Sequence, residues 1–210
     1  MFFDRDDAGR TLARALGELP EDALILGIPR GGVVVARAVA DVLDRPLDVL
    51  VVRKLGAPHN PELAIGAIGP TGALSLDEDV LRALQNVSPE YIDREAAAQM
   101  AEIERRLPLY RGDDPYPEVL GRCCVVVDDG IATGSTARAA LRWLRGVQAQ
   151  PVVLAVPIAP ERTVQELGKE ADRVVVLDTP SNFVAVGQWY THFDQVEDAE
   201  VVAALKRGVT

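Results

Sequence analysis

A run of branched apolar residues that ends in two adjacent acids is the stretch of this sequence best suited to chemistry. Val125–Val127 precedes Asp128 and Asp129, and the turn Ala132–Thr136 follows after two residues. Three valines in succession fit an inner strand of a parallel sheet, because both faces of such a strand are covered. Ligands bind outside the carboxyl ends of these strands, so we expect both carboxylates to face a ligand.

The turn after the acids combines hydroxyl side chains with backbone N–H groups at the start of a helix expected over Ala137–Arg145. Unpaired N–H groups and the positive end of the helix dipole favour phosphate there. Gly134 is expected to let an anion approach the backbone. Carboxylates accept hydrogen bonds from a vicinal diol, so the whole stretch suits a phosphorylated sugar. An ordinary βα turn with Asp and Ser/Thr caps is the alternative, but it does not require two adjacent Asp residues. A P-loop fits less well, because no Lys follows the glycine.

Val125–Thr136 resembles the phosphoribosyl-pyrophosphate (PRPP) binding motif of the type I phosphoribosyltransferases. In that family the acidic pair contacts the ribose 2′- and 3′-hydroxyls and the turn grips the 5′-phosphate. The resemblance implies these roles for Asp128 and Asp129, and it implies magnesium held mainly by PRPP and water, with no metal ligands from the protein. The implied phosphate-binding residues are Ala132, Thr133, Gly134, Ser135 and Thr136.

The glycine-rich turn 27–32 is a second candidate site, with Arg30, Gly31 and Gly32 near a helix start. Arg30 could donate to a pyrophosphate through its forked guanidinium, although any tight βα turn can use glycines. The resemblance places a pyrophosphate loop here and implies a non-proline cis peptide near Pro29–Arg30–Gly31.

Two cations, Arg53 and Lys54, are expected at the end of another strand. They can neutralise charge on a departing pyrophosphate, or they can simply be a solvated strand end. Related transferases carry Arg-Lys at this point, and the resemblance implies a flexible catalytic loop over about 55–75. His59 lies in this loop, where an exposed histidine is a simpler interpretation than a catalytic one.

Aromatic residues concentrate within a segment over about 178–196, in a chain that is only 5% aromatic. Related transferases cover the acceptor with a C-terminal hood, whereas the alternative is a hydrophobic cluster that docks the last helix. At Ala132, 6-oxopurine transferases carry an Asp that serves in proton transfer, while adenine transferases have Ala. The acceptor is therefore not identified. The aromatic and histidine residues of the segment are Phe183, Trp189, Tyr190, His192 and Phe193.

Alternating strands and helices predict an α/β fold, a parallel sheet flanked by helices in a single domain over 1–210. A helical insertion is expected over about 77–117, with an apolar stripe over Pro89–Leu107 interpreted as core packing. A closing helix is expected over Glu197–Arg207. The expected strands are Ala23–Ile28, Leu47–Arg53, Arg122–Val127, Val152–Pro157 and Arg173–Leu177.

The net charge of −10 argues against nucleic acid or an acidic membrane as partner. The N-terminus lacks the form of a signal peptide and no apolar run reaches the length of a spanning helix, so a cytoplasmic location is expected. Cys123 and Cys124 are expected as buried thiols. A homodimer is possible.

The expected function in nucleotide metabolism is transfer of a phosphoribosyl group from PRPP to a small nitrogenous acceptor, with Asp128, Asp129 and Lys54 as catalytic residues. One alternative is a PRPP-binding regulatory protein with little turnover. Another is an enzyme that uses a different phosphorylated ribose. Arg53, Lys54 and the long loop favour the transferase.

Overall fold

A five-stranded parallel sheet forms the centre of the protein in a computed structural model that describes residues 1–84 and 87–206. Every neighbouring pair in the sheet is parallel, which confirms the predicted fold class. The middle strand is the valine-rich one, and it is fully buried as its composition predicts. In spatial order the strands are β2 (Leu47–Val49), β1 (Leu24–Gly27), β6 (Cys124–Val127), β7 (Val152–Ile158) and β8 (Arg173–Asp178).

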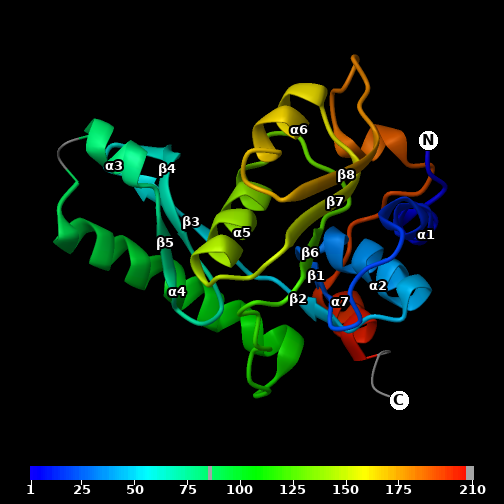
Figure 1. The fold of residues 1–210 in the computed structure, drawn as a ribbon, viewed down its shortest axis with the longest axis horizontal. Helices are drawn as coiled ribbons and strands as arrows, with labels where there is room; N and C mark the ends of the chain where they lie inside the picture. The colour runs from blue at the N-terminus through cyan, green and yellow to red at the C-terminus, as the bar shows by residue number, and fades with distance from the viewer. Residues whose placement is uncertain (85–86, 207–210) are drawn as a thin grey trace.

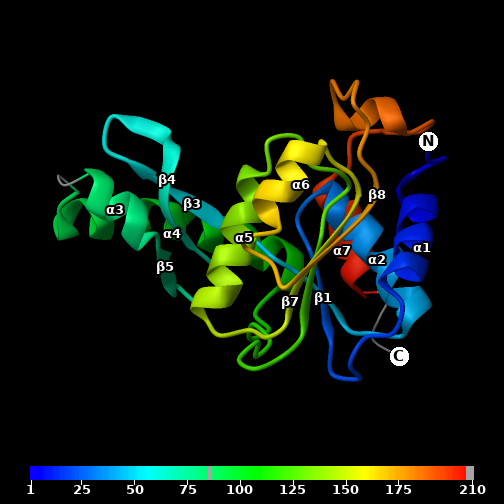
Figure 2. The same cartoon turned by 45° about the horizontal axis from the view of Figure 1, so that its top comes forward.

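Helices cover both faces of this sheet (Figures 1 and 2). Successive residues of a strand point to opposite faces, so Val125 and Val127 pack towards the first two helices while Cys124 and Val126 pack towards the helix that follows β6. One face carries α1 (Arg5–Leu16) and α2 (Gly31–Leu43), and the other carries α5 (Ser135–Gly146) and α6 (Glu161–Leu167).

A second, antiparallel sheet extends away from the first, together with two helices (Figure 1). We call this part, residues 53–84 and 87–111, the arm. Its strands are β3 (Arg53–Ala57), β4 (Asn60–Ile68) and β5 (Leu74–Leu76), and its helices are α3 (Glu78–Leu84) and α4 (Pro89–Arg111).

The structure of the arm differs from the sequence-based prediction in two ways. The strand expected over Leu47–Arg53 is divided, because the chain leaves the parallel sheet after Val49 and Arg53 begins β3. The flexible loop expected over about 55–75 is mostly strand, because β3, β4 and β5 pair in an antiparallel sheet. Leu55 and Ile65 are fully buried in a cluster that includes Ile103 of α4 and also Val33 and Val49, so the arm shares an apolar core with the parallel sheet and α2.

The C-terminal part of the chain returns to the N-terminus. A 3₁₀ helix, η1 (Val186–Trp189), lies in the expected hood segment, and Phe2 forms a parallel bridge with Tyr190. The last helix is α7 (Asp198–Lys206); the expected final residue, Arg207, lies outside the described residues.

In the described part of the chain, no helix combines the length and apolar character needed to cross a bilayer. Cys123 and Cys124 are free and buried, as expected. Burial raises the pKa of Cys124 to about 12, so this thiol stays protonated and unreactive at neutral pH.

Candidate functional site

The two acids lie at the carboxyl end of β6, in the middle of the parallel sheet. The backbone of β1 continues beside them, because the Ile28 N–H donates to the Val127 carbonyl at 2.9 Å. The Asp129 N–H donates to Asp128 Oδ1 at 2.9 Å. Asp128 and Asp129 are both partly buried, at the edge of the sheet where the sequence predicts a ligand.

The N-terminus of α2 is in close contact with this pair. A side chain at Gly31 would overlap Asp129 Oδ2, and a Cβ at Gly32 would lie 2.7 Å from the Val127 carbonyl oxygen. The two glycines therefore let the positive end of the α2 dipole approach the acids, which favours negative charge there. The peptide bond between Pro29 and Arg30 is cis, as the resemblance implies.

Burial makes ionisation of the acids unfavourable. It raises the pKa of Asp128 well above its ordinary value, and the charge of Asp129 raises it further. Burial also raises the pKa of Asp129, but Arg5 acts against this because its Nε lies 2.8 Å from Asp129 Oδ2. The ion pair with Arg5 therefore favours the carboxylate form of Asp129 against the effect of burial.

The turn before α5 presents exposed groups at a helix start. Thr133, Ser135 and Thr136 are exposed. Gly134 occupies the N-cap position, where it has no side-chain acceptor for the N–H groups of the first turn. These donors point out of the helix end, as an anion site requires.

Gly134 is required for a different reason from the one expected. Its φ of +76° is in the left-handed region that favours glycine. An added Cβ would lie 2.9 Å from the Thr163 methyl carbon and 3.1 Å from Leu167. A side chain at this position would therefore collide with α6.

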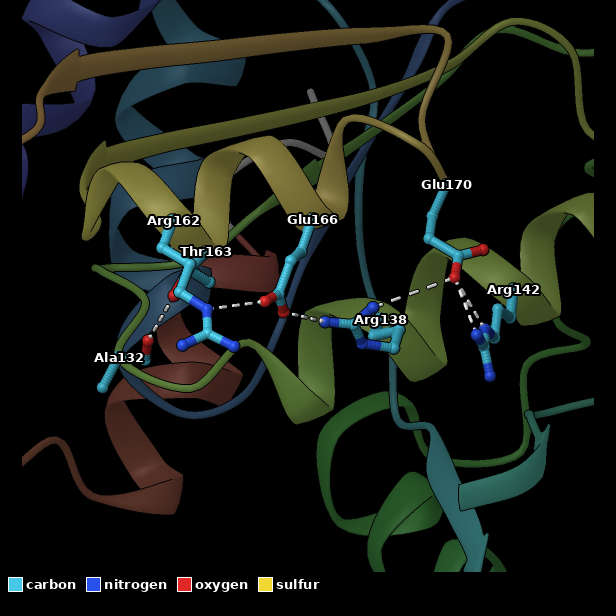
Figure 3. A network of polar contacts seen from close by, with 7 residues as sticks. All are labelled: Ala132, Arg138, Arg142, Arg162, Thr163, Glu166 and Glu170. Atoms are coloured by element: carbon cyan, nitrogen blue, oxygen red, sulfur yellow. Dashed lines mark hydrogen bonds and ion pairs between the residues drawn. The ribbon is translucent and has the colours of Figure 1, made fainter. Parts of the chain in front are cut away.

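Helix α6 packs against the turn that precedes α5 (Figure 3). Thr163 is buried, and its hydroxyl donates to the Ala132 carbonyl at 2.9 Å. Further along, Glu166 pairs with Arg138 at 3.1 Å and Glu170 pairs with Arg142 at 2.8 Å (Figure 3). These contacts fix α5 to α6 and to Glu170 just beyond its end, and so fix the turn at the start of α5.

A cavity of about 320 Å³ lies between the sheet and the arm. Its wall brings together Pro29, Arg53, Lys54, Ser135 and Thr136, which come from three of the predicted sites. Ile28 and residues 50–52 form an apolar part of the wall, and α4 lines another part with polar side chains.

The other predicted residues, including Asp128 and Asp129, do not line this cavity. Arg30 lines a neighbouring cavity of about 290 Å³, and its Nη1 is 3.8 Å from Glu197 Oε2. His59 is exposed at the connection between β3 and β4, with a φ of +63°. This position fits the simple interpretation of an exposed histidine.

Helix α4 contributes cavity residues that the sequence analysis missed. Gln99 Oε1 accepts from Arg53 Nε at 3.0 Å, and Gln99 Nε2 donates to Glu95 Oε1 at 3.2 Å. Arg106 lines the same cavity. Glu95, Gln99 and Arg106 follow one another at intervals of four and seven, which places them on one face of a helix. This polar stripe beside the apolar one is the signal that could have indicated the cavity.

The aromatic segment packs against the acidic pair. The Tyr190 hydroxyl donates to the Asp129 carbonyl at 2.5 Å, and the Tyr190 ring stacks on Phe193 with centroids 4.9 Å apart. The Arg5 guanidinium lies 3.9 Å from the Phe193 ring centroid. The aromatic cluster therefore contacts the N-terminal segment. The alternative to a hood was a cluster that docks the last helix, and these contacts are made with Phe2 and Arg5 instead.

Among residues 1–84 and 87–206, no three His, Cys, Asp or Glu side chains are grouped so as to hold a metal ion. Asp128 and Asp129 directly follow the carboxyl end of β6 and are partly buried.

Residues 6–192 match the family model of the phosphoribosyl transferase domain. Two proteins of Mycobacterium tuberculosis, from strains CDC 1551 and H37Rv, are provisionally named phosphoribosyl transferases. Each is 51% identical over 209 residues, which is 99% of this chain but 47% of the relative, so the chain spans about half the length of either. The crystal structure of TT1426 from Thermus thermophilus is similar with a TM-score of 0.92, at 44% identity over 100% of both chains. This chain belongs to the phosphoribosyl transferase domain family, as Val125–Thr136 predicts.

Proposed function

We propose that this protein transfers a phosphoribosyl group from PRPP to a small nitrogenous acceptor and releases pyrophosphate. The observation that carries the proposal is the cavity in which Lys54 and Arg53 meet the start of α5 and the Pro29 turn. PRPP carries a pyrophosphate at C1 and a phosphate at C5 of its ribose. It therefore needs cations, a turn that binds phosphate and acceptors for its diol, all within reach of one another.

In the proposed complex, Asp128 and Asp129 accept hydrogen bonds from the ribose 2′- and 3′-hydroxyls. The turn from Ala132 to Thr136 binds the 5′-phosphate through the N–H groups of the first turn of α5. The pyrophosphate lies against the turn that contains Arg30, Gly31 and Gly32, close to Arg53 and Lys54. The Asp129 carboxylate, kept ionised by Arg5, supplies the stronger of the two diol contacts.

The reaction is a displacement at C1 of the ribose by a nitrogen nucleophile. The bond from C1 to the pyrophosphate oxygen breaks and a carbon–nitrogen bond forms, through a state with oxocarbenium character. Arg53 and Lys54 stabilise the negative charge that develops on the leaving oxygen. Magnesium, held mainly by PRPP and water, neutralises part of the pyrophosphate charge when it is bound. The remaining contribution is orientation of the two reactants.

The arm would exclude water from the reacting centre if it moved towards the turn before α5. Arg53 and Lys54 are its first residues and already line the cavity, so they can meet the pyrophosphate without a large movement. Exclusion of water prevents hydrolysis of PRPP. PRPP and its acceptors are small metabolites, so the cytoplasm is the location that the proposal implies.

The test is incubation with Mg-PRPP and a panel of bases, amines and nucleosides, while pyrophosphate release is followed. We expect release with at least one acceptor, and its loss in Asp128→Asn/Asp129→Asn and in Lys54→Ala. Lys169→Ala is the matched control, because this exposed lysine follows α6. PRPP binding without release for any acceptor would favour the regulatory protein. Absence of PRPP binding would overturn the proposal.

A further inference from the structure

Arg5 connects the start of the chain to the acidic pair. Its Nε donates to Asp129 Oδ2 at 2.8 Å across a sequence separation of 124 residues. The two side chains are only 11% and 16% exposed. A pair this sheltered is screened little by solvent, so it constrains the carboxylate more than a surface ion pair would.

The same guanidinium is itself held from three sides. Besides Asp129, it donates through Nη1 to the Asp194 carbonyl at 2.9 Å and lies over the Phe193 ring. Phe193 stacks on Tyr190, whose hydroxyl returns to the Asp129 carbonyl. The contacts therefore close a ring that runs from Asp129 through Arg5, Phe193 and Tyr190 back to Asp129.

Backbone pairing places Arg5 in this ring. The Phe2 N–H donates to the Trp189 carbonyl at 2.8 Å, and the N–H groups of Thr191 and His192 donate to the carbonyls of residues 2 and 3 at 2.9 Å. The N-terminus accordingly lies beside η1 (Figure 2). Segment 189–194 and the N-terminal residues form one unit that ends on the acidic pair.

We propose that Arg5 is a positioning residue, which orients the Asp129 carboxylate for the ribose diol and makes diol binding depend on the docking of segment 189–194. The inference rests on the proposed function, in which Asp129 accepts from the ribose. Arg5 occupies Oδ2, so the diol is directed to Oδ1. No role in bond formation or cleavage is required of Arg5.

The charges around Asp129 predict a pH signature. The groups that face it are Asp128, Arg5, the Tyr190 hydroxyl and the N-terminus of α2. Burial raises the pKa of Asp129 and Arg5 opposes the rise. Removal of the guanidinium should therefore raise this pKa further, and a protonated carboxyl binds a diol less well. The loss of affinity should grow as the pH falls.

The experiment compares Arg5→Gln and Arg5→Lys with the wild type by calorimetry of Mg-PRPP over a range of pH. Carboxyl ¹³C NMR of the free protein follows the titration of Asp129, which Asp129→Asn assigns. We expect Arg5→Gln to raise the pKa of Asp129 and to weaken PRPP binding about tenfold or more, because a protonated or misoriented Asp129 loses its charge-assisted hydrogen bond to the diol. Arg5→Lys keeps the positive charge, so it should change the pKa of Asp129 and the affinity for PRPP less than Arg5→Gln does. Arg10→Gln is the control, since Arg10 pairs with Asp6 on the exposed side of the same helix.

A double-mutant cycle separates positioning from simple anchoring of α1. In the Asp129→Asn background, Arg5→Gln should cause no further loss of affinity. An equal loss in both backgrounds, or an unchanged Asp129 titration in Arg5→Gln, would overturn the proposal. If the wild type does not bind PRPP, the proposed function fails, and the NMR titration still decides whether Arg5 controls the carboxylate. If Arg5→Gln does not fold, the NMR titration of Asp129 is measured in Arg5→Lys instead.

Discussion

At the scale of single residues, the carboxyl group of Asp128 lies where burial and the charge of Asp129 both oppose its ionisation. Its pKa in the folded protein is above that in the unfolded chain, so the folded state binds the proton more tightly. The resulting contribution to stability is present at low pH and is lost as the pH rises through the folded-state pKa. At neutral pH, Asp128 therefore makes the fold less stable.

We predict that Asp128→Asn increases the free energy of unfolding at neutral pH while it weakens Mg-PRPP binding. Asn resembles the neutral acid, so it removes the cost of ionising a buried carboxyl group. Each unit by which folding raises the pKa of Asp128 corresponds to about 1.4 kcal/mol of that cost. Urea unfolding at several pH values measures the effect, which should shrink on acidification. Asp113→Asn serves as a control at an exposed position. A less stable Asp128→Asn protein at neutral pH would contradict this account of the site.

Gln99 gives a second prediction at this scale, because it holds Arg53 in the cavity. Gln99→Leu should leave the Arg53 guanidinium without this acceptor and weaken pyrophosphate binding by about 1 kcal/mol. Calorimetry with magnesium pyrophosphate measures the change. Gln165→Leu is the matched control on exposed α6. Equal affinities of the two variants would show that α4 does not act on the site through Gln99.

At the scale of elements, α6 is a support for the phosphate turn. Thr163→Val keeps the shape of the side chain but removes its hydrogen bond to the Ala132 carbonyl, which is then left without this donor. We expect PRPP binding to weaken by about 1–3 kcal/mol, and Thr163→Ser to retain it. Isothermal calorimetry checks the affinities and thermal unfolding checks the fold. Tight binding by Thr163→Val would show that the turn holds its shape without α6.

The elements also show how far the sequence predicts this structure. Periodicity and valine content predict the five parallel strands, and the acids and the turn lie at the end of β6 because these features are local in the chain. Arg53 and Lys54 were expected at the end of a parallel strand and instead begin β3, because the pattern of valines over 49–52 does not record where the chain changes sheets. Arg5 could not be predicted as a partner of Asp129, since only the folded chain brings α1 to β6.

At the scale of the whole molecule, the cavity lies where the arm meets the parallel sheet. Pro29, Ser135 and Thr136 come from the sheet and its helices, while Lys54 and Glu95 come from the arm. A ligand that fills this cavity touches both parts and should hold them together.

We predict that Mg-PRPP slows amide hydrogen exchange in β3, β4 and β5, as well as in the turn before α5. A ligand that bridges the two parts stabilises the closed arrangement, and local opening of the strands becomes less frequent. Hydrogen exchange followed by mass spectrometry measures this, with β8 at the edge of the parallel sheet as an internal reference. Slower exchange at the turn alone would indicate that the arm takes no part in binding.

The most direct test of the central claim is a crystal structure of the protein with Mg-PRPP. The account predicts the 5′-phosphate at the N–H groups of Ala132–Thr136, the ribose hydroxyls on Asp128 and Asp129, and the pyrophosphate between the Pro29–Gly32 turn and Lys54. PRPP bound elsewhere, or bound with its ribose turned away from Asp128 and Asp129, would contradict it.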